Sequence, residues 1–215
     1  DVSLAQARYA FVCLKANSDI AVQYSRMRVT GIKALGLQAN GRVARTAVQK
    51  PDRDIGVDSF EFWIPARWPD DHNLALSCDP ALDPFGPDNI RNGVNRPVNG
   101  PNAWVADPSD TEPTLTFSWE RPRAIRRVEL TFDTDTDHPM ETVLMGHPFR
   151  VLPSCVRAFR LLDGAGRVVH DCRDNHQTRQ VIQWEQSLMT DTLSLVLEAP
   201  DAHIPAALFE VRCYE

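Results

Sequence analysis

Paired cysteines, long apolar runs and excess positive charge are all missing from this 215-residue sequence. The five cysteines are widely spaced without a Cys-x-x-Cys pair, so neither a disulfide framework nor a zinc ribbon is indicated. No apolar run approaches the roughly 20 residues that span a bilayer. Lys and Arg number 23 against 29 Asp and Glu, and a nucleic-acid or anionic-membrane partner is therefore not expected. We expect reduced thiols, a cytoplasmic protein and no membrane span.

Catalytic fingerprints are also missing. The sequence contains no Gly-x-Gly-x-x-Gly turn, no phosphate-binding loop, no His-Glu-x-x-His and no Gly-x-Ser-x-Gly elbow. Gly164 and Gly166 lie between two alternating runs and predict a hairpin connection. Because the chain starts at Asp1 without an initiator Met or a leader, we expect a soluble piece of a longer protein.

Helical periodicity is scarce, whereas alternating runs are frequent. The 16 prolines are scattered, and few stretches repeat apolar residues at helical spacing. This pattern predicts an all-β protein, a sandwich or barrel of short strands. The expected strands are Thr114–Trp119, Ile125–Phe132, Val156–Leu162, Arg167–Cys172, Gln180–Trp184, Thr192–Glu198 and Ala207–Cys213.

The first third of the chain contains fewer strands. Ala10–Leu14, Ile20–Tyr24 and Ser59–Ile64 alternate as strands do, whereas Gln38–Asp54 is polar. These are too few strands to close a layer, and Pro65–Asp71 is the best boundary. We expect residues 1–71 to be the tail of a preceding β domain or an extra layer, and residues 72–215 to form the sandwich.

Several motifs follow one another in a familiar order. They are Asn73-Leu74-Ala75-Leu76, Asn89-Ile90-Arg91-Asn92-Gly93, Ala103-Trp104-Val105-Ala106 and Arg121-Pro122-Arg123-Ala124-Ile125-Arg126-Arg127-Val128. This order resembles the discoidin family, also called coagulation-factor type C or galactose-binding-like domains. The resemblance covers residues 72–215 and implies an antiparallel β-sandwich of the jelly-roll type.

Longer motifs carry a narrower resemblance. They are Asn92–Pro97, Pro101–Ala106, Asp137–Pro148, Asp174–Arg179 and Phe209–Tyr214. They are similar to the C-terminal region of certain bacterial FAD-dependent oxidoreductases. The resemblance implies that FAD and the flavin domain lie upstream in the same polypeptide, as a partner of this chain, and that this chain carries no flavin of its own.

Candidate ligand-binding residues cluster in the Asn-rich segment Asn89–Asn102. Its amides and Arg96 would hydrogen-bond hydroxyl groups of a carbohydrate, or cap their own turns through Asx-type bonds. His138 and His147 flank a second segment of the expected binding surface, and Trp184 would stack on a sugar ring or pack in the core. The candidate ligand-binding set is Asn92, Asn95, Arg96, Asn99, Asn102, His138, His147 and Trp184.

Two groups of oxygen ligands are candidates for a cation. Asp133, Asp135 and Asp137 alternate after an expected strand, which would place three carboxylates on one face as a calcium site, a solvated loop or catalytic groups. The discoidin resemblance implies a structural calcium near Asn92-Gly93, although the family has Asp where Asn92 stands. Asn89, Asn92 and Glu210 would supply oxygens there.

One further cluster is basic. Arg121, Arg123, Arg126 and Arg127 bracket the start of an expected strand. Their guanidinium groups would hold carboxylates of an acidic saccharide or of a neighbouring domain, or form a solvated strand face.

Three functions are consistent with these residues. The first is a non-catalytic accessory module of a larger FAD-dependent oxidoreductase, for domain docking or substrate-side recognition, with carbohydrate as one candidate. The second is an independent carbohydrate-binding module. The third is a metal-dependent hydrolase using Asp133, Asp135, His138 and His147.

Overall fold

The protein consists of β-strands, one 3-10 helix and connecting loops in the part of the chain that the computed structural model describes. The described residues are 15, 17–30, 44–50, 53–54, 56, 58–65, 73–75, 77, 79, 82–97, 100–134 and 152–215. The all-β class predicted from the sequence is confirmed. The elements are β1 (Tyr24–Ser25), β2 (Ala44–Gln49), β3 (Phe60–Pro65), β4 (Asn73–Leu74), η1 (Pro87–Arg91), β5 (Trp104–Val105), β6 (Thr114–Phe132), β7 (Phe159–Asp163), β8 (Val168–Cys172), β9 (Arg179–Leu197) and β10 (Ala207–Tyr214).

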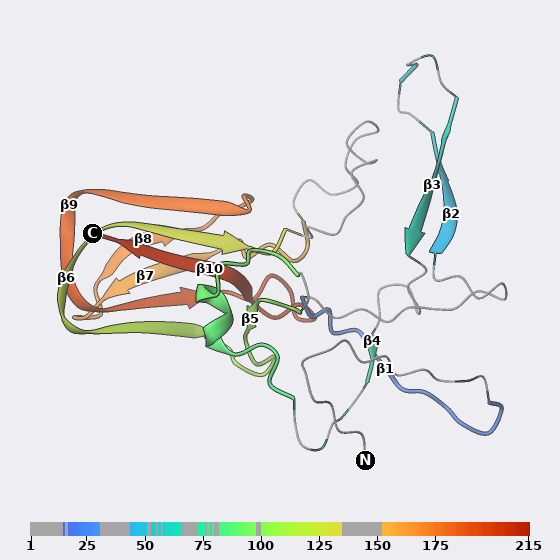
Figure 1. The fold of residues 1–215 in the computed structure, drawn as a ribbon, viewed down its shortest axis with the longest axis horizontal. Coiled ribbons are helices and arrows are strands. Elements are labelled where there is room, and N and C mark those ends of the chain that lie inside the picture. Colours follow the sequence, from blue (N-terminus) through green and yellow to red (C-terminus); the bar gives the residue numbers. More distant parts are fainter. Residues whose placement is uncertain are drawn as a thin grey trace.

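One antiparallel sheet, in the order β5-β10-β6-β9-β7-β8, contains most of the strands. Its two central strands, β6 and β9, are 19 residues long and turn sharply half-way (Figure 1). Residues 114–118 of β6 pair with 192–196 of β9, and residues 123–131 pair with 179–190. In the first of these two regions, β7 and then β8 are added next to β9. In the second region, β10 and then β5 are added next to β6. The sheet therefore folds over as two layers of an antiparallel sandwich.

The bends correct the strand boundaries expected from the sequence. Thr114–Trp119 and Ile125–Phe132 are two halves of β6, and Gln180–Trp184 and Thr192–Glu198 are two halves of β9. At the corner of β6 the register shifts between Ser118 and Arg123, so the alternation of apolar residues is interrupted although the backbone stays extended. In the sequence alone, this interruption has the appearance of a gap between two separate strands.

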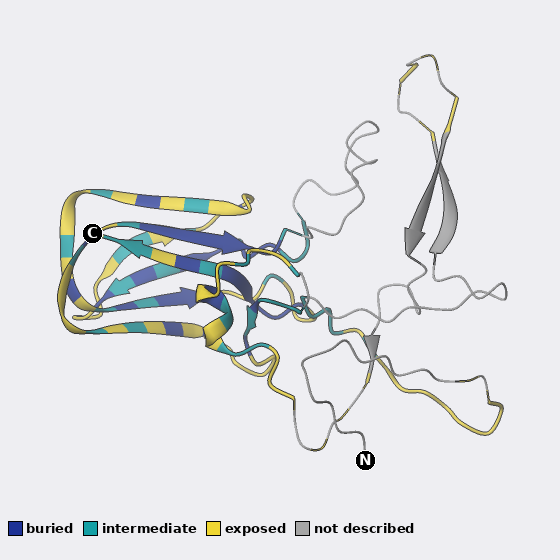
Figure 2. Cartoon of the chain, viewed as in Figure 1, coloured by how far each residue is buried: buried dark blue, intermediate teal, exposed yellow. Residues whose placement is uncertain are grey.

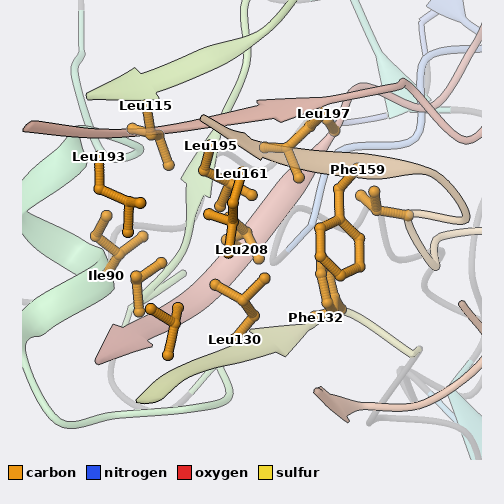
Figure 3. Packing of buried hydrophobic residues seen from close by; sticks show 14 of the residues in the cluster. Ile90, Leu115, Leu130, Phe132, Phe159, Leu161, Leu193, Leu195, Leu197 and Leu208 are labelled. Atoms are coloured by element: carbon orange, nitrogen blue, oxygen red, sulfur yellow. The ribbon is translucent and has the colours of Figure 1, made fainter. Parts of the chain in front are cut away.

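The core lies between the two layers (Figure 3). Leu130, Phe132 and Leu208 from one layer face Phe159, Leu161 and three leucines of β9 from the other. The rings of Phe132 and Phe159 lie 5.3 Å apart, centre to centre. Every second residue of β7 is buried, and burial also alternates along parts of β6 and β9, as the banding of Figure 2 shows. The three leucines are Leu193, Leu195 and Leu197.

Trp184 and η1 cover the two open sides of the sandwich. Trp184 on the first half of β9 donates its indole N–H to the carbonyl of Val169 on β8, at 3.1 Å, and packs against the core. This bond joins the edge strand of one layer to the edge strand of the other. On the opposite side, η1 lies against β10 and β5 and buries Ile90.

The N-terminal third contributes two small sheets. β2 pairs with β3 as an antiparallel hairpin, although Gln38–Asp54 was expected only as a polar stretch. β1 is shorter than the expected strand Ile20–Tyr24 and pairs with β4, across the proposed boundary at Pro65–Asp71. The expected strand Ala10–Leu14 lies outside the described residues. No helix among the described residues is long and apolar enough to cross a membrane.

The segment after β1 lies on the sandwich. The backbone N–H of Arg28 donates to the carbonyl of His203 at 2.8 Å, and the Thr30 hydroxyl donates to Asp133 Oδ2 at 2.5 Å. Arg28 and Thr30 of the N-terminal region therefore contact the sandwich directly.

Candidate functional site

The Asn-rich loop between η1 and β5 is held by two amides, one from Asn89 of η1 and one from Asn102 in the loop itself. Asn89 Nδ2 donates to the carbonyls of Pro84 and Ala103, both at 2.8 Å, which ties the start of the loop to its end. Asn102 adopts a positive φ of 50°, a conformation that Asn tolerates better than most residues. Its Nδ2 lies 3.2 Å from the Arg96 carbonyl and 3.3 Å from the Gly100 carbonyl. The loop backbone is thus fixed from inside.

Asn92 caps a turn in the same loop. Its Oδ1 accepts the backbone N–H of Val94 at 2.7 Å, as in an Asx turn, and Gly93 takes the positive φ of 81° that the turn requires. Its Nδ2 donates to Asn102 Oδ1 at 3.4 Å. The structure therefore brings Asn92 and Asn102 together.

Asn95 and Arg96 differ from these neighbours. Both side chains are exposed, and neither makes a hydrogen bond or ion pair with any residue that the structure describes. Arg91, by contrast, is paired with Asp88 at 2.7 Å. The loop therefore presents one amide and one guanidinium to solvent on a backbone that other amides hold in place. Asn99 lies outside the described residues.

The other candidate ligand-binding residues are placed elsewhere. Trp184 closes the sandwich as described above, so its N–H is already bonded and part of its ring faces the core. His138 and His147 lie in the segment between β6 and β7 that is outside the described residues.

Two candidate metal ligands have protein partners. The Asp133 carboxylate is buried and accepts the Thr30 hydroxyl. Glu210 Oε1 lies 2.6 Å from Arg212 Nη2. Asp135 and Asp137 are outside the described residues. Among the residues that are described, no three or more His, Cys, Asp or Glu side chains gather as a metal site would require.

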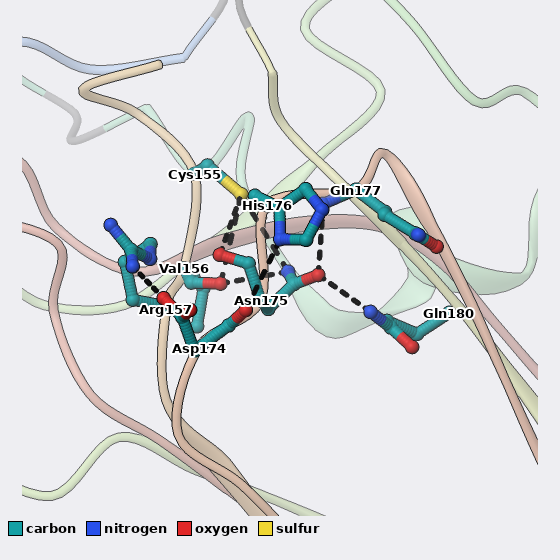
Figure 4. Close-up of polar contacts among 8 residues, drawn as sticks. All are labelled: Cys155, Val156, Arg157, Asp174, Asn175, His176, Gln177 and Gln180. Atoms are coloured by element: carbon teal, nitrogen blue, oxygen red, sulfur yellow. Dashed lines mark hydrogen bonds and ion pairs between the residues drawn. The ribbon is translucent and has the colours of Figure 1, made fainter. Parts of the chain in front are cut away.

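A polar cluster at the loop end of the sandwich centres on buried Asn175 (Figure 4). Its Nδ2 donates to the Val156 carbonyl at 2.8 Å, while its Oδ1 accepts the backbone N–H of Gln177 at 3.0 Å and Nε2 of Gln180 at 2.8 Å. Its backbone N–H donates to the Arg157 carbonyl at 2.8 Å. One side chain thus joins the segment before β7 to the segment between β8 and β9.

Exposed polar groups surround this buried amide. Arg157 pairs with Asp174, and His176 Nδ1 lies 3.3 Å from the Asp174 carbonyl (Figure 4). Burial raises the pKa of the nearby Cys155 thiol to about 11, so the thiol stays protonated at neutral pH and is no nucleophile. The sequence indicated this region through the motif Asp174–Arg179, but it did not indicate that Asn175 is the buried member.

A small acidic pocket lies where the N-terminal segment meets the sandwich. Met27 lines it together with Asp107, Asp110 and Asp201. Each carboxylate caps its own turn; the Ser109 hydroxyl and backbone N–H, for example, lower the pKa of Asp107. This part of the surface is therefore negative and would repel an anionic ligand.

No protein-family model and no curated protein matches the sequence. Similar solved structures include the family 32 carbohydrate-binding module of EndoD from Streptococcus pneumoniae, with a TM-score of 0.46 and 13% identity over 63% of this chain and 88% of that one. A family 32 module of a family 31 glycoside hydrolase from Clostridium perfringens has a TM-score of 0.45 and 13% identity, over 62% and 87%. The family 32 module of NanJ from C. perfringens, solved with galactose, has a TM-score of 0.41 and 11% identity, over 59% and 82%.

At this identity and degree of superposition the likeness assigns no function to the chain. The antiparallel sandwich follows from the strand pairings of the protein itself. The resemblance to FAD-dependent oxidoreductases has no counterpart among these similar structures and stays a prediction from the sequence motifs.

Proposed function

We propose that this protein is a carbohydrate-recognition module that binds sugar hydroxyl groups through the loop between η1 and β5. One observation carries the proposal. Asn95 and Arg96 are exposed and without a partner among the described residues, on a loop whose backbone Asn89 and Asn102 hold in place.

This arrangement suits a small polar ligand. Amide and guanidinium groups supply the donors and acceptors that sugar hydroxyls require. A loop that is already ordered loses little conformational entropy when a ligand binds, and this helps weak contacts to produce measurable affinity. The similar structures named above include modules described as carbohydrate-binding, and they suggest which ligands to test first.

The first experiment measures the melting temperature of the protein against galactose, N-acetylglucosamine, fucose and their oligosaccharides, each with calcium and with chelator. A ligand that binds only the folded state raises the melting temperature by mass action. We expect a rise with at least one sugar. A rise with calcium alone would indicate a structural cation, and no rise across the panel would overturn the proposal.

A second experiment locates the site. For a sugar that binds, Arg96→Ala and Asn95→Ala should each weaken binding by about tenfold, the value of one lost hydrogen bond to a charged or well-placed group. Arg91→Ala is the matched control, since Arg91 is also exposed but pairs with Asp88 in η1. Equal losses in all three variants would show that the loop is not the site.

We also propose, from the sequence motifs, that the module belongs to a larger FAD-dependent oxidoreductase, with the flavin in an upstream domain. The contacts of Arg28 and Thr30 with the sandwich support a docking role, because they show that preceding chain packs on it. An independent carbohydrate-binding module is equally consistent with the fold. Copurification of flavin with the polypeptide in its natural source distinguishes the two.

A further inference from the structure

The outer face of the layer formed by β10, β6 and the first half of β9 carries an unusual side chain. Glu129 on β6 points away from the core, where strand side chains ordinarily meet water, yet only 8% of it is exposed. Its Oε2 accepts Nη2 of Arg179 at 2.5 Å and the hydroxyl of Tyr214 at 3.5 Å. Its Oε1 lies 3.4 Å from Nε of Arg127. One buried carboxylate thus gathers groups from three strands.

The strand register explains how they meet. Arg212 on β10 and Val181 on β9 lie directly opposite Glu129, one on each side. Arg127 lies opposite Tyr214, and its guanidinium carbon sits 4.2 Å from the centre of the Tyr214 ring. Arg212 is itself paired with Glu210 at 2.6 Å. We call Arg127, Arg179, Arg212, Glu129 and Tyr214 the arginine platform.

The platform is ordered but not saturated. A guanidinium has five N–H donors, and the contacts described above involve only one or two of them on each arginine. The side chains of Arg127, Arg179 and Arg212 remain 41%, 61% and 50% exposed. Glu129 therefore holds Arg127 and Arg179, and Glu210 holds Arg212, while other donors of the three arginines remain available to solvent.

The local charge of the platform indicates the charge of the ligand that it would bind. The platform contains three guanidinium groups and one carboxylate, and adjoining Glu210 pairs with Arg212, so this part of the surface has a local charge of plus one in a chain whose net charge is −6. A ligand with a single carboxylate matches the local charge, whereas a polyanion would be repelled by the rest of the molecule. Half-exposed Val181 and the exposed amide of Gln183 adjoin the platform and offer a ring contact and a hydroxyl partner.

We propose that the arginine platform binds the carboxylate of a uronic-acid sugar, at a second site on the sheet face, separate from the loop between η1 and β5. A guanidinium donates two parallel hydrogen bonds to a carboxylate, which gives geometric selectivity as well as affinity. The inference goes beyond the proposed function, because it assigns a different surface and an anionic ligand. It stands or falls independently of the loop.

The test uses a matched pair of sugars, methyl β-glucuronide and methyl β-glucoside, which differ only at C6, where the glucuronide has a carboxylate and the glucoside a hydroxymethyl group. Titration of the isotope-labelled protein should give saturable shifts at backbone amides of residues 127–131, 179–183 and 210–214 with the glucuronide. The glucoside should give none there. Equal shifts with both sugars, or no shifts with the glucuronide, would overturn the proposal.

Variants distinguish specific binding at the platform from non-specific electrostatic attraction to the protein. Arg212→Gln and Arg179→Lys should each weaken glucuronide binding by about tenfold, the value of one charge-assisted hydrogen bond. Arg160→Gln is the control, because Arg160 lies on the other layer and pairs with exposed Glu112. Arg179→Lys keeps the charge, so the variant protects Glu129 from being left unpaired. An equal loss in Arg160→Gln would mean non-specific attraction and overturn the site.

Two further arms distinguish other outcomes. A hexa-aspartate peptide that binds the platform more tightly than the glucuronide would identify an acidic protein segment as the partner and overturn the sugar assignment. Arg96→Ala should leave glucuronide binding unchanged. If Arg96→Ala abolished it and Arg212→Gln did not, the glucuronide would bind at the loop, and the platform proposal alone would fail.

Discussion

Single buried polar side chains organise the loop end of the sandwich. Asn175 is 1% exposed and satisfies both ends of its amide, one with a carbonyl before β7 and the other with groups that lead into β9. Removing a buried amide leaves its partners without water to replace it, so the loss exceeds the net value of the bonds. Asn175 is the residue whose replacement should be felt most strongly in this region.

We expect Asn175→Ala to lower the free energy of unfolding by about 2–3 kcal/mol. His176→Ala is the control, because the adjacent histidine is exposed and should change stability by less than about 0.5 kcal/mol. Urea unfolding followed by circular dichroism measures both. Similar small losses in the two variants would contradict the structural role of Asn175.

At the scale of elements, the bend of β9 depends on Thr190. This buried residue accepts the backbone N–H of Gly164 at 3.0 Å and that of Thr192 at 3.3 Å, and it donates to the Thr192 carbonyl at 2.5 Å. The β7–β8 hairpin is thereby attached to the corner where β9 passes from one layer to the other. These hydrogen bonds require the hydroxyl group of Thr190, because a methyl group in its place can neither donate nor accept a hydrogen bond.

Thr190→Val keeps the shape of the side chain and removes the hydroxyl. We expect a loss of about 2 kcal/mol, since three backbone groups lose a part-buried hydrogen-bond partner. Thr116→Val is the control; its hydroxyl pairs with Ser194 on an exposed face and should matter little. Thermal unfolding compares the two. Equal effects would show that the bend does not require this hydroxyl.

The hairpin between β7 and β8 is held by Asp163. Its Oδ1 accepts the backbone N–H groups of Ala165 and Arg167, at 3.0 and 2.9 Å, and its Oδ2 accepts Nε of Arg167 at 2.8 Å. Gly166 supplies the positive φ of 75° at the turn. The Arg167 side chain, followed by these backbone bonds, lowers the pKa of Asp163 below its ordinary 3.8.

This lowered pKa predicts a pH dependence. A carboxyl whose pKa is depressed on folding contributes stability above its unfolded pKa, and the contribution is lost as pH falls through the folded pKa. The melting temperature of Asp163→Asn should therefore lie below that of the parent protein at pH 6, and the difference should shrink below pH 3.8. In Asp88→Asn, where the pair with Arg91 is exposed on both sides, no difference is expected at either pH. A constant difference for Asp163→Asn would contradict the charge effect.

At the scale of the whole molecule, two layers made from one folded sheet must be closed along their sides. Trp184 closes one side by packing against the core and by bonding to Val169. Its two contributions can be separated. We expect Trp184→Phe, which loses the N–H, to lower stability by about 1 kcal/mol, and Trp184→Ala, which also leaves a cavity, by about 3 kcal/mol or more.

Guanidinium unfolding followed by circular dichroism gives both values. If Trp184→Phe and Trp184→Ala lost the same amount, the hydrogen bond rather than packing would dominate. If neither lost stability, the indole would not close the sandwich, and its surface would be available for a ligand.

Alternation of residue types was sufficient to predict much of the fold. The runs that became β7, β8 and β10, and the Gly-containing hairpin between β7 and β8, are visible as short alternating runs around a turn, although only β7 buries every second residue. The corner of β6 was not predictable, because its polar residues resemble a turn. The side-chain partners in the loop between η1 and β5 could not be predicted either, since an Asn that caps a turn and an Asn that binds a ligand have the same local sequence.

What the sequence determined by itself is local: which segments extend, which face of each is apolar and where the hairpin turns, all of which depend on near neighbours. The tertiary structure decided what depends on register between distant strands. It bent β6 and β9 into two layers, buried Glu129 on an outer face, and brought it to Arg179 and Tyr214, which lie 50 and 85 residues away. No spacing in the chain encodes such meetings, because hydrogen bonds between strands and the packing of the common core set the register.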